Sequence, residues 1–354
     1  MRSTLMRAVN RGELLRIRPG VFVETWQWLT AKPWTRHAAL AAAVGLQQPT
    51  AIFCRETALT IYGVPQLSVP AAVHVRAVST SGCGASAAPP VTGSSSDSLI
   101  AQVKAEAERR EDAYVSAFKP LPLRRCLPPV PLQSTAPESR KLYWSSETGP
   151  GGIRVPVPEV RLEDGTAAEV MTEPLPFALM DTLPRLSRQR AIVALDAAMA
   201  GRYGYGRRVT RDDLETVSEW LWSRRAVRAW DWAATFADPL SESPGESRSR
   251  VLIHQLGFAA PKLQTPIRLP DGSTARLDFD WEADRVAGEF DGRIKFDQAA
   301  GLSGTTESGV YWNQIQREEK VRDTGRSIAR WNWGDLAEPR RLELKLLREG
   351  VSRR

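Results

Sequence analysis

The pattern of apolar and polar positions predicts a helix and a hairpin at the start of the chain. Residues 3–11 (STLMRAVNR) have the spacing of a short helix, and in GELLRIRPGVFV the side chains alternate on both sides of a Pro19-Gly20 turn. Residues 35–45 (TRHAALAAAVG) predict an Ala-rich helix that Thr35 can cap. A helix followed by a basic hairpin is typical of the end of a winged helix-turn-helix, and we expect the first two helices of such a unit to be absent here.

The next part of the chain changes from regular patterning to a low-complexity composition. PTAIFCRETALTIYGVP predicts a short strand and a helix ending at Gly63, and VHVRAV (73–78) predicts a strand. Residues 79–98 are small, polar and Pro-containing, which is typical of a flexible linker. Residues 99–118 have the pattern of a charged, Ala-rich helix, and residues 119–152 are again rich in Pro and Ser, so we expect mostly irregular structure there.

Regular patterning returns near Ile153. Residues 160–171 predict a hairpin with Asp164-Gly165 at its turn, and PFALMDTLPRL and RQRAIVALDAAMAG predict two helices, the second ended by Gly201. Residues 210–236 predict two more helices rich in tryptophan, and an aromatic set at this spacing favours core packing over a binding platform. These tryptophans are Trp220, Trp222, Trp230 and Trp232.

The last third of the chain predicts a helix, three strands, a helix, a strand and a closing helix. Ser243 can cap the first helix, with Pro244 in its first turn and Glu246 at the capping-box position. LQTPIRL and ARLDFDW flank a turn at Asp271-Gly272, and VAGEFDGRIKF follows. The later elements are WNQIQREEKVRDT, SIARWNW and LAEPRRLELKLLREG.

Acidic residues gather on two of these strands. Because strand side chains alternate, Asp278 and Asp280 share one face of the second strand, and Glu289 and Asp291 share one face of the third. Carboxylates on neighbouring strands suit Mg²⁺, which prefers oxygen ligands and activates water for phosphodiester cleavage. Lys295 follows and can orient water or phosphate. The alternative is a hairpin whose acids are only solvated.

Two basic clusters accompany these acids. Arg317 and Lys320 are one helical turn apart and can reach phosphate, although a solvated charged face explains them equally well. Residues 1–36 hold seven Lys or Arg against two acids, within a chain of net charge +7. This surplus is compatible with a nucleic-acid partner. The residues expected to contact nucleic acid are Arg7, Arg11, Arg16, Arg18, Arg317 and Lys320.

Composition excludes several classes of protein. No apolar run reaches 18 residues and no signal-peptide pattern is present, so we expect no membrane span. Three widely spaced cysteines and three scattered histidines predict neither a disulfide framework nor a histidine-based metal site. A reducing, cytoplasmic location fits this cysteine usage.

The C-terminal motifs are similar to a known nuclease family. ESRSRVLIHQLGF, LDFDW, GEFDGRIKF and REEKVRDTG with SIARWNW resemble the family related to very-short-patch-repair endonucleases, within the PD-(D/E)xK superfamily, over about residues 246–335. The resemblance implies metal binding by Asp278 and Glu289, with Asp291 close by and Glu246 as the acid of the leading helix. The superfamily's usual lysine position is Asp291 here, and Lys295 stands where close relatives often have His.

The N-terminal motifs resemble another family. RGELLRIRPGVFV, RHAALAAAV, IFCRETALTIYGVP and VHV, with the later PLPFALMDTL and AIVALDAAMAG, are similar to AbiEi-type antitoxins and transcriptional regulators over roughly residues 1–76 and 153–201. This resemblance implies a winged-helix DNA-binding repressor with a cognate toxin protein as a partner.

The expected fold class is α/β (α+β) with several domains. The expected divisions are a truncated winged-helix-type region over 1–76, a low-complexity linker with one charged helix over 77–152, a hairpin and helical region over 153–240, and a restriction-endonuclease-like mixed sheet flanked by helices over 241–354.

Three functions stay open from the sequence. The first is a Mg²⁺-dependent DNA endonuclease, with Mn²⁺ as an alternative ion, acting in repair or phage defence through Asp278, Glu289, Asp291, Lys295 and Glu246. The second is a non-catalytic DNA-binding antitoxin or regulator on a nuclease-like scaffold. The third is a protein-interaction module without a nucleic-acid function.

Overall fold

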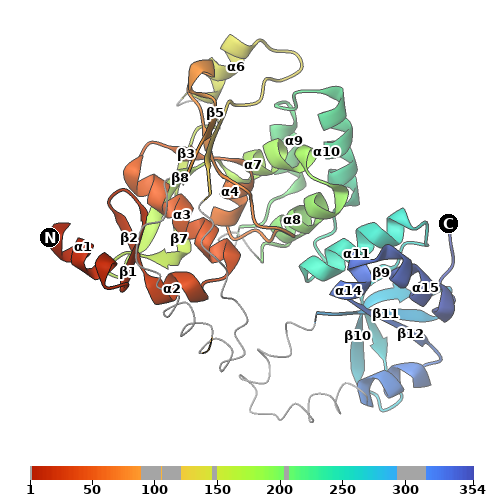
Figure 1. The fold of residues 1–354 in the computed structure, drawn as a ribbon. Helices are drawn as coiled ribbons and strands as arrows, with labels where there is room; N and C mark the ends of the chain where they lie inside the picture. The colour runs from red at the N-terminus through yellow and green to blue at the C-terminus, as the bar shows by residue number, and fades with distance from the viewer. Residues whose placement is uncertain (1, 89–104, 106–120, 146–149, 203–206, 293–315) are drawn as a thin grey trace. The chain divides into compact units, whose positions relative to one another are not determined.

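The computed structural model shows an α/β fold with several sheets, divided into two compact units (Figure 1). The structure describes residues 2–88, 105, 121–145, 150–202, 207–292 and 316–354. The first unit holds residues 1–185 and 203–231, and the second holds residues 186–202 and 232–354. Within the described ranges, no helix combines the length and apolar character that crossing a membrane requires.

The first unit begins with the predicted helix and hairpin. Helix α1 (Arg2–Asn10) leads into strands β1 (Leu14–Arg18) and β2 (Val21–Glu24), which pair antiparallel around Gly20, whose φ is +78°. Glycine adopts this left-handed conformation without a steric cost. Helices α2 (Thr25–Thr30) and α3 (Pro33–Gln47) follow. The cap expected at Thr35 is instead at Lys32, because Pro33 occupies the first turn, where a missing N–H costs nothing.

A six-stranded mixed sheet forms the centre of the first unit, in the order β5-β6-β4-β3-β8-β7. Strands β3 and β4 are antiparallel, while β4 pairs parallel with β6 and β3 pairs parallel with β8. Segments far apart in the chain therefore lie side by side. The strands are β3 (Ile52–Phe53), β4 (Val73–Arg76), β5 (Gly84–Ser86), β6 (Leu123–Cys126), β7 (Ile153–Arg161) and β8 (Ala167–Thr172).

This sheet corrects the expected organisation in two places. Residues 119–152 were expected to be irregular, yet they supply β6 and helix α6 (Ala136–Tyr143), which begins with a Thr135–Glu138 capping box. The 77–152 segment is therefore not a linker throughout, and strands from 1–76 and 153–240 share one sheet instead of forming separate domains. The physical reason is long-range pairing, since β6 is only 4 residues long and gains its hydrogen bonds from β4 and β5. Apart from residue 105, the helix expected over 99–118 lies outside the described residues.

The predicted hairpin and helices of the central region are confirmed. Strands β7 and β8 turn at Gly165, and Gly201 ends helix α8 (Arg188–Ala200) in a left-handed conformation. Two of the tryptophans, Trp220 and Trp230, are buried, as core packing requires, and Trp220 meets Phe177 edge-on at 5.3 Å. The other helices are α4 (Arg55–Ile61), α7 (Leu175–Thr182), α9 (Arg211–Ser218) and α10 (Arg224–Phe236).

Within the second unit, residues 241–354 have the predicted order of elements around a four-stranded sheet, β12-β11-β10-β9, except that two helices instead of one follow the last strand. Its antiparallel strands are β9 (Lys262–Arg268), β10 (Thr274–Trp281) and β11 (Val286–Asp291), and β12 (Ser327–Asn332) lies parallel to β11. Residues 316–323 are helical. The remaining helices are α11 (Pro244–Gln255), α14 (Trp333–Ala337) and α15 (Pro339–Glu349).

One aromatic core holds this sheet against its helices. Phe279, Trp281 and Trp331 pack with Leu252 and Ile253 of α11 and with apolar residues of α14 and α15. Gly288 of β11 lies beneath these rings, so close that a Cβ there would be 2.7 Å from Trp331 and 2.8 Å from Trp281. The central strands are thereby fixed at the point where they carry their acidic residues.

Candidate functional site

The centre of the candidate site is Asp278 on β10, beside Glu289 on β11. The antiparallel register pairs Phe279 with Gly288, the residues next to Asp278 and Glu289 in the two strands. The backbone N–H of Phe290 donates to a carboxylate oxygen of Asp278 over 3.2 Å. The two acids thus meet on adjacent strands, as the sequence predicted.

The environment of Asp278 opposes its negative charge. Burial is the largest cause and the carboxylate of Glu246 the second, and together with Glu289 they raise the pKa of Asp278 to about 6. The Phe290 N–H and the guanidinium of Arg317 act in the other direction without cancelling this effect. Glu246 and Glu289 therefore both lie within electrostatic range of Asp278.

Glu246 has a structural role as well as this proximity. It is in the first turn of α11, where the Ser243 hydroxyl and the Glu242 N–H each donate to its carboxylate over 2.8 Å. Gln264 of β9 donates to the same carboxylate over 2.9 Å. Helix capping holds Glu246 in place and leaves it 7% exposed, close to Asp278.

Glu289 is held by arginines. A guanidinium nitrogen of Arg330, its register partner on β12, donates to it over 2.7 Å, and Arg317 lies 3.8 Å from its other oxygen. Arg330 also pairs with Glu318 of the 316–323 helix. Arg330 was not among the residues singled out from the sequence, because its meeting with Glu289 depends on the parallel pairing of β11 with β12.

The remaining predicted acids have different surroundings. Asp291 is the last residue of β11 and lies opposite Asn332 of β12. Burial lowers the pKa of Arg330, but the carboxylates of Glu289, Glu318 and Asp291 outweigh this effect and raise it. Asp280 is 2% exposed and accepts a hydrogen bond from Arg326 over 3.2 Å, which makes it a structural ion pair. Lys295 lies outside the described residues.

A pocket of about 560 Å³ opens beside Asp278. Its basic members are Arg276, Arg317 and Lys320, so the two helical residues expected to share a face do meet at this pocket. Arg317 donates to the Arg276 carbonyl over 2.6 Å, and Lys320 pairs with Asp271 over 2.8 Å. The pocket therefore has the carboxylate of Asp278 beside three cationic side chains.

The donor chemistry fits Mg²⁺ in part. Among the residues that the structure describes, no group of three or more His, Cys, Asp or Glu side chains is arranged to hold a metal ion. Mg²⁺ does not require such a cage, because it keeps several waters and is often bound through one or two carboxylates. Asp278 and Glu289 supply that minimum of oxygen ligands.

The four basic residues expected to contact nucleic acid near the N-terminus differ in exposure. Arg7 and Arg11 are exposed, and Arg11 pairs with Glu13 over 2.6 Å. Arg16 is half-buried. Arg18 is only 7% exposed, and burial and the nearby charge of Arg125 lower its pKa. The hairpin therefore presents fewer cationic groups to solvent than the alternation of its sequence indicates.

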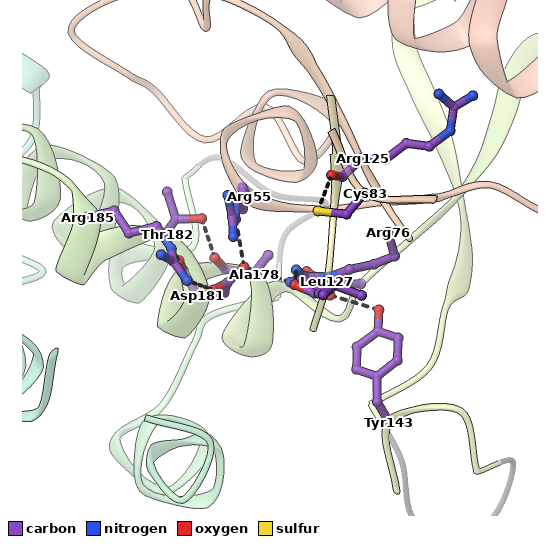
Figure 2. A network of polar contacts seen from close by, with 11 residues as sticks. Arg55, Arg76, Cys83, Arg125, Leu127, Tyr143, Ala178, Asp181, Thr182 and Arg185 are labelled. Carbon is purple, nitrogen blue, oxygen red and sulfur yellow. Dashed lines mark hydrogen bonds and ion pairs between the residues drawn. The ribbon is translucent and has the colours of Figure 1, made fainter. Parts of the chain in front are cut away.

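A second polar cluster, buried in the first unit, was not predicted (Figure 2). Arg76 of β4 pairs with Glu173 over 2.5 Å and with Asp181 over 2.7 Å, and none of these side chains is exposed. Arg55 and Arg185 also bind Asp181, and the Tyr143 hydroxyl donates to Glu173 over 2.8 Å. The available sequence signal was a charged residue inside an apolar run, as in VHVRAV and PFALMDTL. The cluster ties four segments of the unit together, around Arg55, Arg76, Tyr143 and residues 173–185.

Comparison with known proteins identifies relatives without a known role. The uncharacterized proteins MT2308 and Rv2248, from two Mycobacterium tuberculosis strains, are each 29% identical to this chain over 140 residues. The match covers 40% of this chain and 49% of each relative, so the chain spans about half the length of the curated relatives it matches. No protein-family model and no solved structure matches the chain.

Proposed function

We propose that this protein is a metal-dependent DNA endonuclease of the PD-(D/E)xK type, acting in the cytoplasm. The observation that carries the proposal is the position of Asp278, a half-buried carboxyl beside Glu246 and Glu289 at a pocket with a cationic rim. Burial and the neighbouring carboxylates disfavour the negative charge of Asp278, and a bound cation would stabilise that charge. The odd number of cysteines and their wide spacing in the sequence agree with the proposed location.

The proposed roles follow from the contacts of each residue. Asp278 and Glu289 would hold Mg²⁺ or Mn²⁺, with Asp291 at the end of the same strand and Glu246 held nearby by its cap. The bound ion would supply a water of lowered pKa and neutralise charge on the phosphate. Arg276, Arg317 and Lys320 would bind the DNA backbone as point charges and hydrogen-bond donors.

The test is plasmid nicking by the purified full chain. Wild-type protein with Mg²⁺ or Mn²⁺ is expected to convert supercoiled plasmid to the nicked form, and Asp278→Asn is expected to lower the rate at least about a hundredfold, since metal ligation is lost. Asp323→Asn is the matched control, because Asp323 is an exposed acid in the same unit. Equal rates for wild type and Asp278→Asn would contradict the proposal.

The second candidate is a DNA-binding antitoxin or regulator without cleavage activity, with a toxin protein as partner. The observation that favours it is the α1 helix and β1–β2 hairpin with Arg7 and Arg11 exposed. It predicts DNA binding whose salt dependence becomes less steep by about one unit of log-log slope for each phosphate contact removed in Arg7→Ala and Arg11→Ala. An unchanged slope in both variants would exclude this role for the α1–β1 region.

A further inference from the structure

Glu289 is already ion-paired with a cationic side chain of the protein itself. Arg330 donates to one of its oxygens over 2.7 Å, and the two residues are register partners on the parallel strands β11 and β12. Arg330 also binds Glu318, which pairs with Arg322 over 3.5 Å. Arg330 therefore lies between two carboxylates, Glu289 of the candidate metal site and Glu318 of the neighbouring helix.

Asp278 has a different environment from Glu289. No ion pair to Asp278 is found among the residues that the structure describes, and its hydrogen bond is to a neutral backbone N–H. Glu289 is 15% exposed at its side chain and Arg330 is 30% exposed, so their pair is partly shielded from solvent. Of the two proposed metal ligands, Asp278 is not ion-paired within the described residues, whereas Glu289 is neutralised by Arg330 of the protein itself.

We propose that Arg330 is an internal counter-ion that competes with the divalent cation for Glu289 and thereby sets the affinity of the site for metal. The inference rests on the proposed function. A divalent ion that binds Glu289 must weaken or replace the Arg330 contact, and the two positive charges repel each other at short range. Glu318 keeps Arg330 paired when Glu289 turns to the metal, so Arg330 is not left as an unpaired, partly buried charge.

The experiment measures Mn²⁺ affinity directly, by electron paramagnetic resonance of the free ion in titrations of the full-length protein. Arg330→Gln is expected to bind Mn²⁺ on the order of tenfold more tightly than wild type, because a unit charge a few ångströms away, at an effective dielectric constant of about 20, contributes at least that much. Arg330→Lys keeps the charge and is expected to stay within about threefold of wild type. Nicking rates are recorded only as a secondary readout.

Two further variants make the comparison specific. Arg322→Gln removes an arginine that pairs with Glu318, while no ion pair joins it to Glu289 in the described part of the chain. Because Arg322 is 54% exposed, the effect of this variant is expected to be below about threefold. Glu318→Gln removes the alternative partner of Arg330 and is expected to weaken Mn²⁺ binding several-fold. Thermal unfolding of each variant shows whether it is folded. If Arg330→Gln does not fold, the Mn²⁺ affinities of Glu318→Gln and Arg330→Lys test whether Arg330 competes with the metal.

The outcomes separate this inference from the function on which it rests. If wild type binds Mn²⁺, Asp278→Asn does not, and Arg330→Gln binds it more tightly, then both the metal site and the competition by Arg330 are supported. The same Asp278-dependent binding with unchanged or weaker affinity in Arg330→Gln overturns the competition and leaves the metal site standing. If wild type and Asp278→Asn bind Mn²⁺ equally or not at all, the proposed metal site itself is wrong.

Discussion

Arg76 and Asp181 form an ion pair inside the first unit, with 2.7 Å between the guanidinium and the carboxylate and neither side chain exposed (Figure 2). Asp181→Ala would leave Arg76 buried with half of its carboxylate partners, Glu173 remaining. We expect the free energy of unfolding to fall by about 3–5 kcal/mol, because an uncompensated buried charge has no solvent to replace its partner. Urea denaturation followed by circular dichroism measures this loss.

The matched control for that prediction is Glu13→Ala. Glu13 pairs with Arg11, and both side chains are more than half exposed, at 55% and 59%. Its removal is expected to lower the stability far less than Asp181→Ala does, because solvent screens an exposed ion pair. Equal losses in the two variants would show that the buried cluster contributes no more than a surface pair.

The raised pKa of Asp278 predicts how Asp278→Asn changes stability with pH. A carboxyl whose folded pKa is about 6, above its unfolded value, stabilises the fold when protonated, and that contribution is lost as pH rises from about 4 through 6. The asparagine variant does not lose this contribution. It is therefore expected to be more stable than wild type at pH 7.5, by on the order of 3 kcal/mol, and no more stable below pH 4.

Thermal unfolding of both proteins from pH 3 to pH 8 checks the sign of that difference. Asp196 has a pKa raised to about 6 as well, mainly by burial, so only the difference between variant and wild type isolates Asp278. A variant that is less stable than wild type at pH 7.5 would contradict the account. Saturating Mn²⁺ is expected to raise the melting temperature of wild type and not of Asp278→Asn.

Glu246 is predicted to act on Asp278 through its charge. Glu246→Gln removes the like charge that is the second largest cause of the raised pKa, so the pKa of Asp278 is expected to fall. Titration of the Asp278 carboxyl carbon by nuclear magnetic resonance measures it. Ser243→Ala, which weakens the same cap while keeping the Glu246 charge, is the control, and an equal shift in both variants would attribute the effect to helix capping.

Gly288 is predicted to be required by packing. A Cβ there would be 2.7–2.9 Å from Trp331, Trp281 and Phe279, closer than real contacts allow, so Gly288→Ala is expected to cost about 1–3 kcal/mol. At Gly292 the nearest atom, on Phe290, is 3.4 Å away, and Gly292→Ala is expected to cost much less. Chemical denaturation of the two variants compares them, and similar costs would count against the close packing of β11.

The local elements were predictable because their signals lie within a few residues of one another. The hairpin at Asp164-Gly165, the helix stop at Gly201 and the Ser243 cap all appear where the sequence indicated. The adjacency of Asp278 and Glu289 was predictable for the same reason, since the intervening turn is short and strand side chains alternate with a fixed period.

Other features depended on contacts between distant segments. Strand β6 is a 4-residue piece in a Pro-rich stretch, and only its pairing with β4 and β5 identifies it as a strand. The alternation in LLRIR indicated solvent-facing arginines, yet Arg18 is buried, and the register of the hairpin shifts between Arg16 and Arg18. Asp280 is two residues after Asp278 in the same strand, so the alternation of side chains does not distinguish the two acids. In the structure Asp280 forms an ion pair with Arg326.

By itself the sequence determined the order of the strands in residues 241–354, many of the turns and caps that bound the elements, and the presence of two acidic strands next to each other. Tertiary structure alone decided that distant strands close one sheet in the first unit, that Arg76, Glu173 and Asp181 meet out of solvent, and that Arg330 lies against Glu289. The physical reason is that periodicity and capping are properties of neighbouring residues. Burial, strand partners and the charges around a carboxyl are set by residues far away in the chain.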